Sequence, residues 1–172
     1  MTDLPLGGTV GLVRHGQADW TEQGRIIGQA DRPLTEAGRA QIRILASRLL
    51  DDGWVRIISS PLVRASDSAE IINERLQLAT VELDDRLVER GYGVAEGTTI
   101  SIAKALYPIE GGAPGSERSA DFAARVNSIV GDIMLAQNKK ILVITHAAVI
   151  AQVCQVFKAE PRYIATGSIT YL

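Results

Sequence analysis

The sequence is poor in histidine and cysteine, and this scarcity excludes several kinds of site. Among 172 residues there are two histidines and one cysteine, Cys154. A single cysteine cannot form an internal disulfide or a cysteine-based zinc site. The apolar neighbours of Cys154 favour the role of a small buried hydrophobic residue.

Long apolar segments and clusters of positive charge are also missing. The longest apolar runs, such as residues 141–144, are far too short to span a bilayer, and residues 1–8 contain no apolar signal core. The net charge is −2, and lysine and arginine are scattered rather than clustered, which argues against nucleic-acid binding. We therefore expect a soluble, cytoplasmic protein that binds neither membranes nor nucleic acids.

Several catalytic signatures are absent from the sequence. It contains no GxxxxGK[ST] nucleotide loop, no HExxH motif, no histidine–cysteine cluster with zinc spacing and no GxSxG elbow. The glycines at 7 and 8 precede a β-rich run instead of following one, so they do not form a dinucleotide fingerprint. We expect neither a cofactor nor a bound metal.

Short β-rich runs alternate with segments of helical periodicity, which predicts an α/β fold. Strands are expected at residues 9–13, 55–58, 81–83, 140–145 and 164–172. One helix is expected to follow Thr35 as its N-cap and to stop at Gly53, and a second is expected to start with Ser60 as its cap and Pro61 in first position. Three more helices are expected around 102–106, from about 121, and at 148–157. The glycine-rich stretch 86–119 predicts loops, which often carry function.

The two histidines occupy equivalent places, each directly after an expected strand. His15 follows the first strand, and His146 follows the apolar run 140–145. If these strands are parallel neighbours, both imidazoles lie at the same rim of the sheet, where ligands bind in open α/β folds. Arg14 and Arg64, the latter in the first turn of another helix that leaves a strand, would make that rim a phosphate cradle. The alternative is that the histidines are ordinary capping or core residues and Arg64 is a solvated helix arginine.

Five sequence blocks resemble the histidine phosphatase superfamily, in its phosphoglycerate mutase-like branch. They are residues 12–17 (LVRHGQ), 24–35 (GRIIGQADRPLT), 59–65 (SSPLVRA), 87–93 (LVERGYG) and 143–146 (VITH). Their order and their spread over nearly the whole chain make the resemblance specific. It implies a three-layer α/β/α sandwich around a central, mostly parallel sheet. It also implies a single domain over residues 1–172, with a short loop-rich cap at about 90–118.

The resemblance implies catalytic roles for five residues. His15 would attack phosphorus, Arg14, Arg64 and His146 would bind the phosphoryl oxygens, and Glu89 would protonate the leaving oxygen. The implied phosphate-binding set as a whole comprises Arg14, Gly16, Gln17, Thr21, Gly28, Arg64, His146 and Ala147. A nucleophilic imidazole must be neutral, with its other nitrogen donating to an acceptor such as a backbone carbonyl. A carboxyl group that acts as an acid needs a raised pKa, which burial supplies.

Some positions depart from the family pattern or compete for a role. Thr21 stands where asparagine is common, and Ala147 stands where glycine is usual, but neither change removes a catalytic group. Glu96 is a second candidate acid, and its place in the motif favours support of a loop. Asp31 precedes Arg32 and Pro33 and is interpreted as a turn residue.

The short stretch between Glu89 and His146 predicts hydrolysis. Mutases of this family have a longer, more basic cap, whereas Lys104 and Arg118 are the only basic residues between Gly91 and Arg125. We expect a metal-independent phosphomonoester hydrolase that forms a phosphohistidine on His15. Mutase-type transfer between sugar-acid hydroxyls and a non-catalytic phosphate-binding protein stay open. The expected partner is a small phosphorylated metabolite, with a phosphoprotein as the alternative, and the oligomeric state is left open.

Overall fold

The structure is a computed structural model that describes residues 10–107, 112–135, 139–159 and 164–172. Its strands are β1 (Val10–Arg14), β2 (Arg56–Ser59), β3 (Val81–Leu83), β4 (Ile141–Thr145) and β5 (Ile169–Tyr171). Its α-helices are α1 (Asp19–Glu22), α2 (Glu36–Arg48), α3 (Val63–Leu76), α4 (Ile100–Leu106), α5 (Ser119–Leu135) and α6 (Ala147–Val156). Two 3₁₀ turns, η1 (Asp85–Leu87) and η2 (Gly93–Ala95), precede α4.

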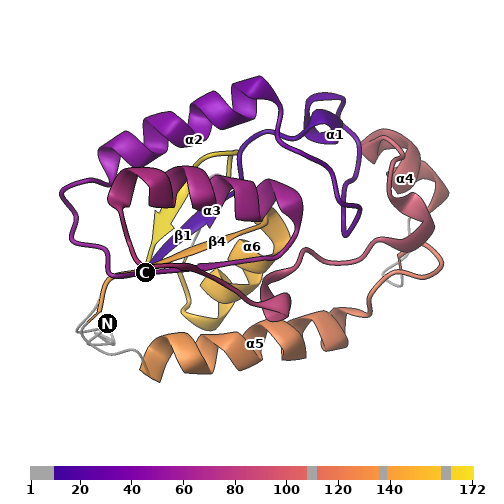
Figure 1. The fold of residues 1–172 in the computed structure, drawn as a ribbon. Helices are drawn as coiled ribbons and strands as arrows, with labels where there is room; N and C mark the ends of the chain where they lie inside the picture. The colour runs from indigo at the N-terminus through magenta and orange to yellow at the C-terminus, as the bar shows by residue number, and fades with distance from the viewer. Residues whose placement is uncertain (1–9, 108–111, 136–138, 160–163) are drawn as a thin grey trace.

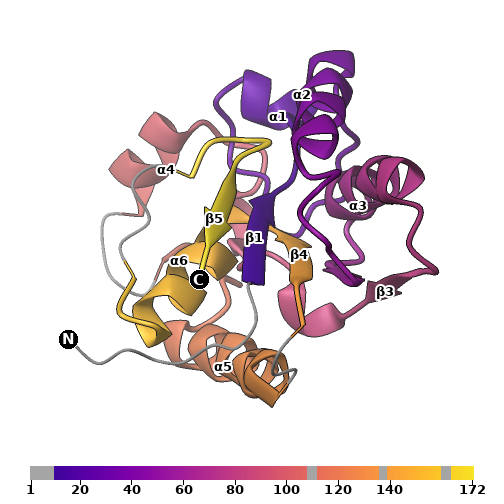
Figure 2. The ribbon, with the colours of Figure 1, turned by 90° about the vertical axis from the view of Figure 1, so that its left-hand side faces the viewer.

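The strands form one sheet in the order β3-β2-β4-β1-β5. β1 and β4 are parallel neighbours, with Val10 opposite Ile141 and Arg14 opposite Thr145. β2 is parallel to β3 and to β4, and only β5 runs antiparallel, beside β1 at the edge (Figure 2). The carboxyl ends of the four parallel strands therefore meet at one rim, and the prediction of a mostly parallel sheet is confirmed.

Helices cover both faces of the sheet, as the sequence predicts. α2 and α3 lie on one face, and α5 and α6 lie on the other (Figure 1). Because successive side chains of a strand point to opposite faces, neighbouring residues of β1 pack against different helix layers. Leu12 packs with the residues of α5 and α6, and Val13 packs with those of α2 and α3. All five residues of β4 are buried, which confirms a central strand that is covered on both sides.

The local signals locate most elements within two or three residues, with some corrections. Thr35 caps α2 as predicted, since its Oγ1 accepts from the Gly38 amide. That helix ends at Arg48, however, before the predicted stop at Gly53. The predicted helix start at Ser60 and Pro61 is wrong, because α3 begins at Val63. The first predicted strand includes Thr9, which lies outside the described residues, and the last strand spans only 169–171 of the predicted 164–172.

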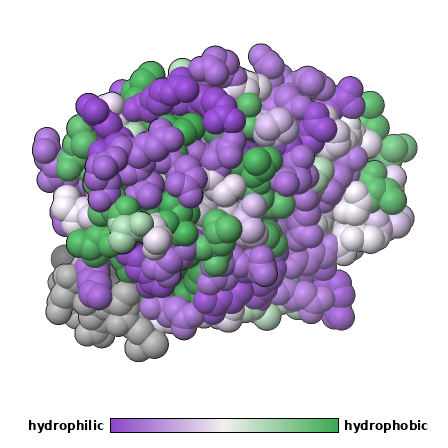
Figure 3. Space-filling model, in the orientation of Figure 1, coloured by the Kyte–Doolittle hydropathy of each residue, from purple (hydrophilic) through white to green (hydrophobic). Residues whose placement is uncertain are grey.

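The rim of the sheet is covered by a separate group of short elements. α1 and α4 lie at the end of the molecule toward which β1 and β4 run (Figure 1). Hydrophobic side chains reach the surface over that end (Figure 3), among them Ile100, Ile102 and Leu106 of α4, which are 49%, 50% and 62% exposed. None of the helices in the described part of the chain is both long and apolar enough to cross a membrane.

Candidate active site

His15 is held at the end of β1 in one defined orientation. Its amide donates to the carbonyl of Thr145 on the neighbouring strand β4, at 3.0 Å. Its Nδ1 lies 2.7 Å from the carbonyl oxygen of Gly16. A carbonyl can only accept, so Nδ1 carries the proton and the lone pair is on Nε2. Gly16 has to be glycine, because a Cβ there would lie 2.5 Å from the Gly38 carbonyl oxygen.

His146 lies beside His15, as the strand arrangement requires. It follows β4 and precedes the first residue of α6, and the two ring centroids are 5.1 Å apart. The prediction that both histidines share one rim is confirmed. The Nε2 atom of His146 lies 2.8 Å from Ser60 Oγ, and its buried Nδ1 has no hydrogen-bond partner among the described residues. Burial, with the nearby charge of Arg64, lowers the pKa of both histidines well below the ordinary value, so both rings are neutral at pH 7.

Arg64 is buried against His15. Only 1% of the residue is exposed, and its Nε donates to Nε2 of His15 at 3.3 Å. Its two terminal nitrogens donate to the carbonyls of Ala30 at 2.9 Å and Gly28 at 2.7 Å. Burial lowers the pKa of the guanidinium to about 10, so it stays charged at neutral pH. Arg14, at the end of β1, donates from Nη1 to the Ile164 carbonyl at 2.7 Å.

Glu89 faces the same cavity as His15 from the loop after η1. The residue is 9% exposed, and burial raises the pKa of its carboxyl group. Its Oε1 accepts from the Arg90 amide at 2.9 Å, and its Oε2 lies 3.5 Å from the Ala148 amide at the start of α6. Burial opposes ionisation more strongly than these donors favour it, so the carboxyl group is poised to hold a proton.

Glu96 serves a different purpose from Glu89. Its carboxylate accepts from the amides of Gln29 and Tyr92 at 2.9 Å and of Ala30 at 3.1 Å. Gly28, which has a φ of +57°, lies so close that a Cβ there would be 2.1 Å from Glu96 Oε1. Glu96 therefore fixes the loop whose carbonyls bind Arg64, which agrees with the loop-supporting interpretation.

A cavity of about 560 Å³ opens over these groups. Its inner end is lined by Arg14, His15, Thr21, Gly28, Arg64 and Glu89. The rest of the lining is mainly apolar and aromatic, but it also includes three basic residues. It consists of Gly24, Arg25, Ile26, Ile27, Arg90, Tyr92, Ala95, Ile100, Ala103, Lys104, Tyr107, Gly112, Ala113 and Ser116. The cavity thus joins a cationic floor to an apolar wall.

Four residues of the predicted phosphate-binding set lie outside the lining of this cavity: Gly16, Gln17, His146 and Ala147. The Gln17 side chain accepts from Thr35 Oγ1 at 2.9 Å and so supports the start of α2. Ala147 is the first residue of α6. Thr21 does line the cavity, and its buried Oγ1 has no partner in the described part of the structure.

Two serines near the histidines were not predicted from the sequence to belong to the site. Ser60 contacts His146, as described above. Ser68 Oγ accepts from the Gly16 amide at 3.1 Å and donates to the Arg64 carbonyl at 2.6 Å, which ties the loop after β1 to α3. The signal for Ser68 is its place four residues after Arg64, one turn along the same helix face. Within the described ranges, no group of three or more His, Cys, Asp or Glu side chains is placed to hold a metal ion.

The site thus combines a buried histidine pair and a buried arginine near the ends of parallel strands with a buried carboxyl group from a loop, and comparison with known proteins identifies the family of the chain. The family model described as "Histidine phosphatase superfamily (branch 1)" matches residues 10–166. The chain belongs to this superfamily.

Two curated relatives show where the chain lies within the superfamily. The uncharacterized phosphatase PhoE of Bacillus subtilis (strain 168) is 37% identical over 157 residues, which cover 90% of this chain and 80% of that protein. The probable phosphoglycerate mutase GpmB of Yersinia pestis (strain Pestoides F) is 44% identical over 89 residues. That match covers 52% of this chain and 41% of the mutase.

Solved structures with the same fold include phosphatases. Bacillus stearothermophilus YhfR aligns with a TM-score of 0.85 and 28% identity, over 95% of this chain and 90% of that one. A mycobacterial glucosyl-3-phosphoglycerate phosphatase, in complex with VO3, aligns with a TM-score of 0.83, 28% identity and the same coverage. These matches agree with the fold class predicted from the sequence.

Proposed function

We propose that this chain is a phosphomonoester hydrolase that works through a phosphohistidine on His15. The observation that carries the proposal is the state of the His15 ring. Its Nδ1 proton is held by the Gly16 carbonyl, so the lone pair is on Nε2, which accepts a hydrogen bond from Arg64 Nε at 3.3 Å. A neutral imidazole fixed in this tautomer beside a buried cation is a ready nucleophile for phosphorus.

In the first step, the lone pair of His15 Nε2 attacks phosphorus and the bond to the leaving oxygen breaks. A phosphoryl group at Nε2 comes within reach of Arg64, whose charge, with that of Arg14, stabilises the equatorial oxygens. Glu89 gives its proton to the leaving oxygen, which departs as an alcohol. The raised pKa of Glu89 keeps that proton available.

In the second step, a water molecule replaces the alcohol. The Glu89 carboxylate takes a proton from water as the water oxygen attacks phosphorus, and the bond between phosphorus and Nε2 breaks. Inorganic phosphate leaves, and Glu89 is protonated again. His146 donates a hydrogen bond from Nδ1 to the phosphoryl group, because its Nε2 is already hydrogen-bonded to Ser60 Oγ. Neither step requires a metal ion.

The cavity supports a small phosphorylated compound as the substrate. We propose that residues 90–118 act as a cap, because several side chains from the described part of this stretch line the outer cavity. An apolar and aromatic wall suits a substrate whose alcohol has an apolar or cyclic body. A phosphoprotein would need the phosphorylated side chain to reach the floor past this wall, so the small molecule is favoured.

A mutase is the alternative that the resemblance to GpmB over 89 residues supports. In that case the phosphohistidine would be attacked by a second sugar-acid hydroxyl instead of water. The sparse positive charge of the cap favours water, since Lys104 and Arg118 are the only basic residues from 92 to 124.

The test is to trap the intermediate. The protein is mixed briefly with ³²P-labelled phosphoester and quenched without acid, and the label is located on the chain. We expect acid-labile label on His15, release of inorganic phosphate that survives EDTA, and loss of both in His15→Ala. Transfer of label to 3-phosphoglycerate without phosphate release would identify a mutase. Absence of both label and turnover would leave a non-catalytic phosphate-binding protein.

A further inference from the structure

Glu89 lies in a segment, residues 86–91, that belongs to no α-helix or strand. The segment runs from the 3₁₀ turn η1 toward η2, so no long ladder of backbone hydrogen bonds fixes its direction. Among the described residues, the carboxyl group accepts hydrogen bonds from the Arg90 amide within the segment and, at 3.5 Å, from the Ala148 amide. The position of the carboxyl group therefore depends on the position of the segment.

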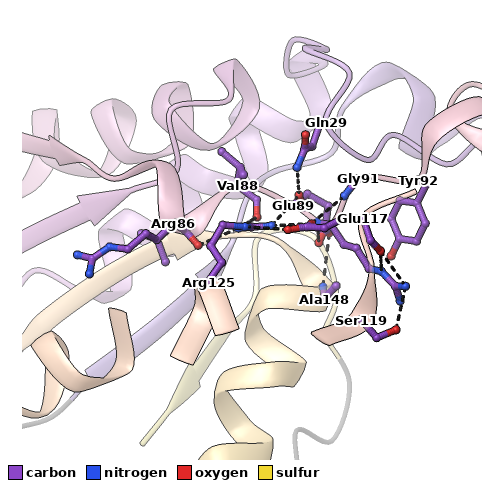
Figure 4. A network of polar contacts seen from close by, with 12 residues as sticks. Gln29, Arg86, Val88, Glu89, Gly91, Tyr92, Glu117, Ser119, Arg125 and Ala148 are labelled. Carbon is purple, nitrogen blue, oxygen red and sulfur yellow. Dashed lines mark hydrogen bonds and ion pairs between the residues drawn. The ribbon is translucent and has the colours of Figure 1, made fainter. Parts of the chain in front are cut away.

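Arg125 of α5 binds the backbone of this segment at three places (Figure 4). Its Nη1 donates to the carbonyls of Arg86 at 2.9 Å and Val88 at 2.8 Å. Its Nη2 lies 3.5 Å from the carbonyl of Glu89 itself. A planar guanidinium can bind several oxygens at fixed angles, so one side chain sets the path of the chain before the acid.

Glu117 binds both Arg125 and the segment, and we call this pair of side chains, Arg125 and Glu117, the clamp. Its carboxylate accepts from Arg125 Nε at 3.0 Å and Nη2 at 2.8 Å, and its Oε2 also accepts from the Gly91 amide at 3.2 Å. The Glu117 amide donates to the Gly91 carbonyl at 2.9 Å. The side chains of Arg125 and Glu117 are only 20% and 19% exposed, so this is a sheltered, bidentate pair.

Two further side chains bind carbonyls of the segment. Gln29 Nε2 donates to the Glu89 carbonyl at 3.0 Å, and Thr145 Oγ1 donates to the Leu87 carbonyl at 2.8 Å. The carbonyls of residues 86–89 are thus all bound by side chains from distant parts of the chain. None of these five side-chain contacts involves the carboxyl group of Glu89, which lines the cavity.

We propose that Arg125 and Glu117 are positioning residues for the general acid of the site, and this inference rests on the proposed role of Glu89. They fix the backbone from residue 86 to residue 91, and through it they aim the Glu89 carboxyl group at the leaving oxygen. Their pairing has a second consequence. Glu117 neutralises Arg125, so the clamp supplies hydrogen bonds without adding a net positive charge that would favour the ionised form of Glu89.

The first experiment compares two substrates that need the acid to different degrees. An alkyl phosphate needs a protonated leaving oxygen, whereas p-nitrophenyl phosphate does not. In Arg125→Met we expect kcat for the alkyl ester to fall by about tenfold to a hundredfold, with a much smaller change for the nitrophenyl ester and little change in KM. Equal slowing of both esters would overturn the positioning role.

Asp132→Asn is the matched control. Asp132 also lies on α5 and also contacts the segment, through a 2.8 Å ion pair with the Arg86 side chain. It stands two turns, about 10 Å, beyond Arg125 and touches none of the carbonyls that Arg125 holds. We expect this variant to treat the two esters as the parent does. If Asp132→Asn reproduces the leaving-group effect, loss of the link between α5 and the segment is sufficient and the assignment to Arg125 fails.

A double variant and a titration test whether Arg125 and Glu117 act through Glu89. In the Glu89→Gln background, Arg125→Met should add no further loss on the alkyl ester, because both changes remove the same step; an additive loss would contradict the proposal. If Arg125→Met does not fold, Glu117→Gln takes its place in the comparison. Carboxyl ¹³C NMR of Glu117→Gln should then show a lower pKa for Glu89 than the same measurement on Asp132→Asn. Were the parent chain to hydrolyse neither ester, the proposed function would fail, and this titration would still decide whether the clamp controls Glu89.

Discussion

At the scale of single residues, one physical cause prepares two groups of the site in opposite ways. Burial disfavours the charged form of both His15 and Glu89. For the imidazole this means a lowered pKa and a neutral ring, the state that the proposed nucleophile requires. For the carboxyl group it means a raised pKa, the direction that the proposed acid requires. Burial of the site therefore shifts both pKa values in the useful direction without a separate device for each.

Thr21 offers a test of the proposal that the inner end of the cavity binds phosphate. Its Oγ1 is buried, lines the cavity and has no partner among the described residues. A hydrogen bond to a charged oxygen contributes about 1.5–3 kcal/mol, so Thr21→Val should weaken inhibition by inorganic phosphate by roughly tenfold or more. Thr21→Ser, which keeps the hydroxyl, should bind phosphate much as the parent does.

The same substitution should leave the fold intact. Valine matches threonine in shape, and the change removes a buried hydroxyl without stranding a partner. We expect the Tm of Thr21→Val to equal or exceed that of the parent. Unchanged inhibition by phosphate together with an unchanged Tm would mean that Thr21 has no contact with the ligand.

At the scale of elements, sequence patterns predict those features whose causes are local. The apolar run 140–145 and the small residues after it place β4 and α6 to within about a residue, and the Thr35 cap is correct. Because β1 and β4 are parallel neighbours, the meeting of the two histidines follows from their place after each strand. The clamp on Glu89 was not predicted, because Arg125 stands 36 residues further along the chain.

The start of α3 is another feature that depends on a residue far away in the chain. The Ser60-Pro61 pair has the local signature of a helix start, yet the helix begins at Val63, and its N-cap, Leu62, has no side-chain acceptor. The free Val63 amide donates instead to Asp31 Oδ1 at 2.7 Å, from 32 residues upstream. Asp31, interpreted from the sequence as a turn residue, therefore caps a helix, and no local rule could identify this pairing.

Removal of that distant cap should have a measurable effect. Asp31→Ala leaves the first amide of α3 without its acceptor, and we expect a loss of about 1 kcal/mol in the free energy of unfolding. Asp31→Asn keeps an oxygen acceptor and should lose less. Urea unfolding of the three proteins would show the order. Equal stability of the alanine variant and the parent would mean that the contact does not stabilise the helix.

At the scale of the whole molecule, the site makes stability depend on pH. An unfolded histidine has a pKa of about 6.5, and the pKa values of folded His15 and His146 lie well below this. Between those values the unfolded chain binds more protons, so the free energy of unfolding should fall as the pH is lowered from about 7 toward 5. Glu89 acts in the opposite sense, since its stabilising contribution is complete below the ordinary carboxyl pKa and is lost as the pH rises through its raised value.

Urea unfolding between about pH 7.5 and 5 would measure the histidine effect. The chain has only these two histidines, so a double variant, His15→Asn with His146→Asn, should lose most of the dependence in this range. A double variant whose stability depends on pH in the same way as that of the parent would contradict the expected burial of the neutral rings, since Glu89 is present in both proteins.

The position of β4 has a consequence for the order in which the molecule can be completed. β4 lies between β1 and β2 in the sheet, although more than eighty residues separate β2 from β4 in the chain. While a ribosome is still making the chain, β1 and β2 lack the strand that joins them, and their edges stay open until residue 145 has emerged. His15 precedes this strand by more than a hundred residues, so its neutral, buried state waits for the Thr145 carbonyl and the His146 ring. We therefore expect a nascent chain to keep the His15 imidazole exposed and titratable until β4 has joined the sheet.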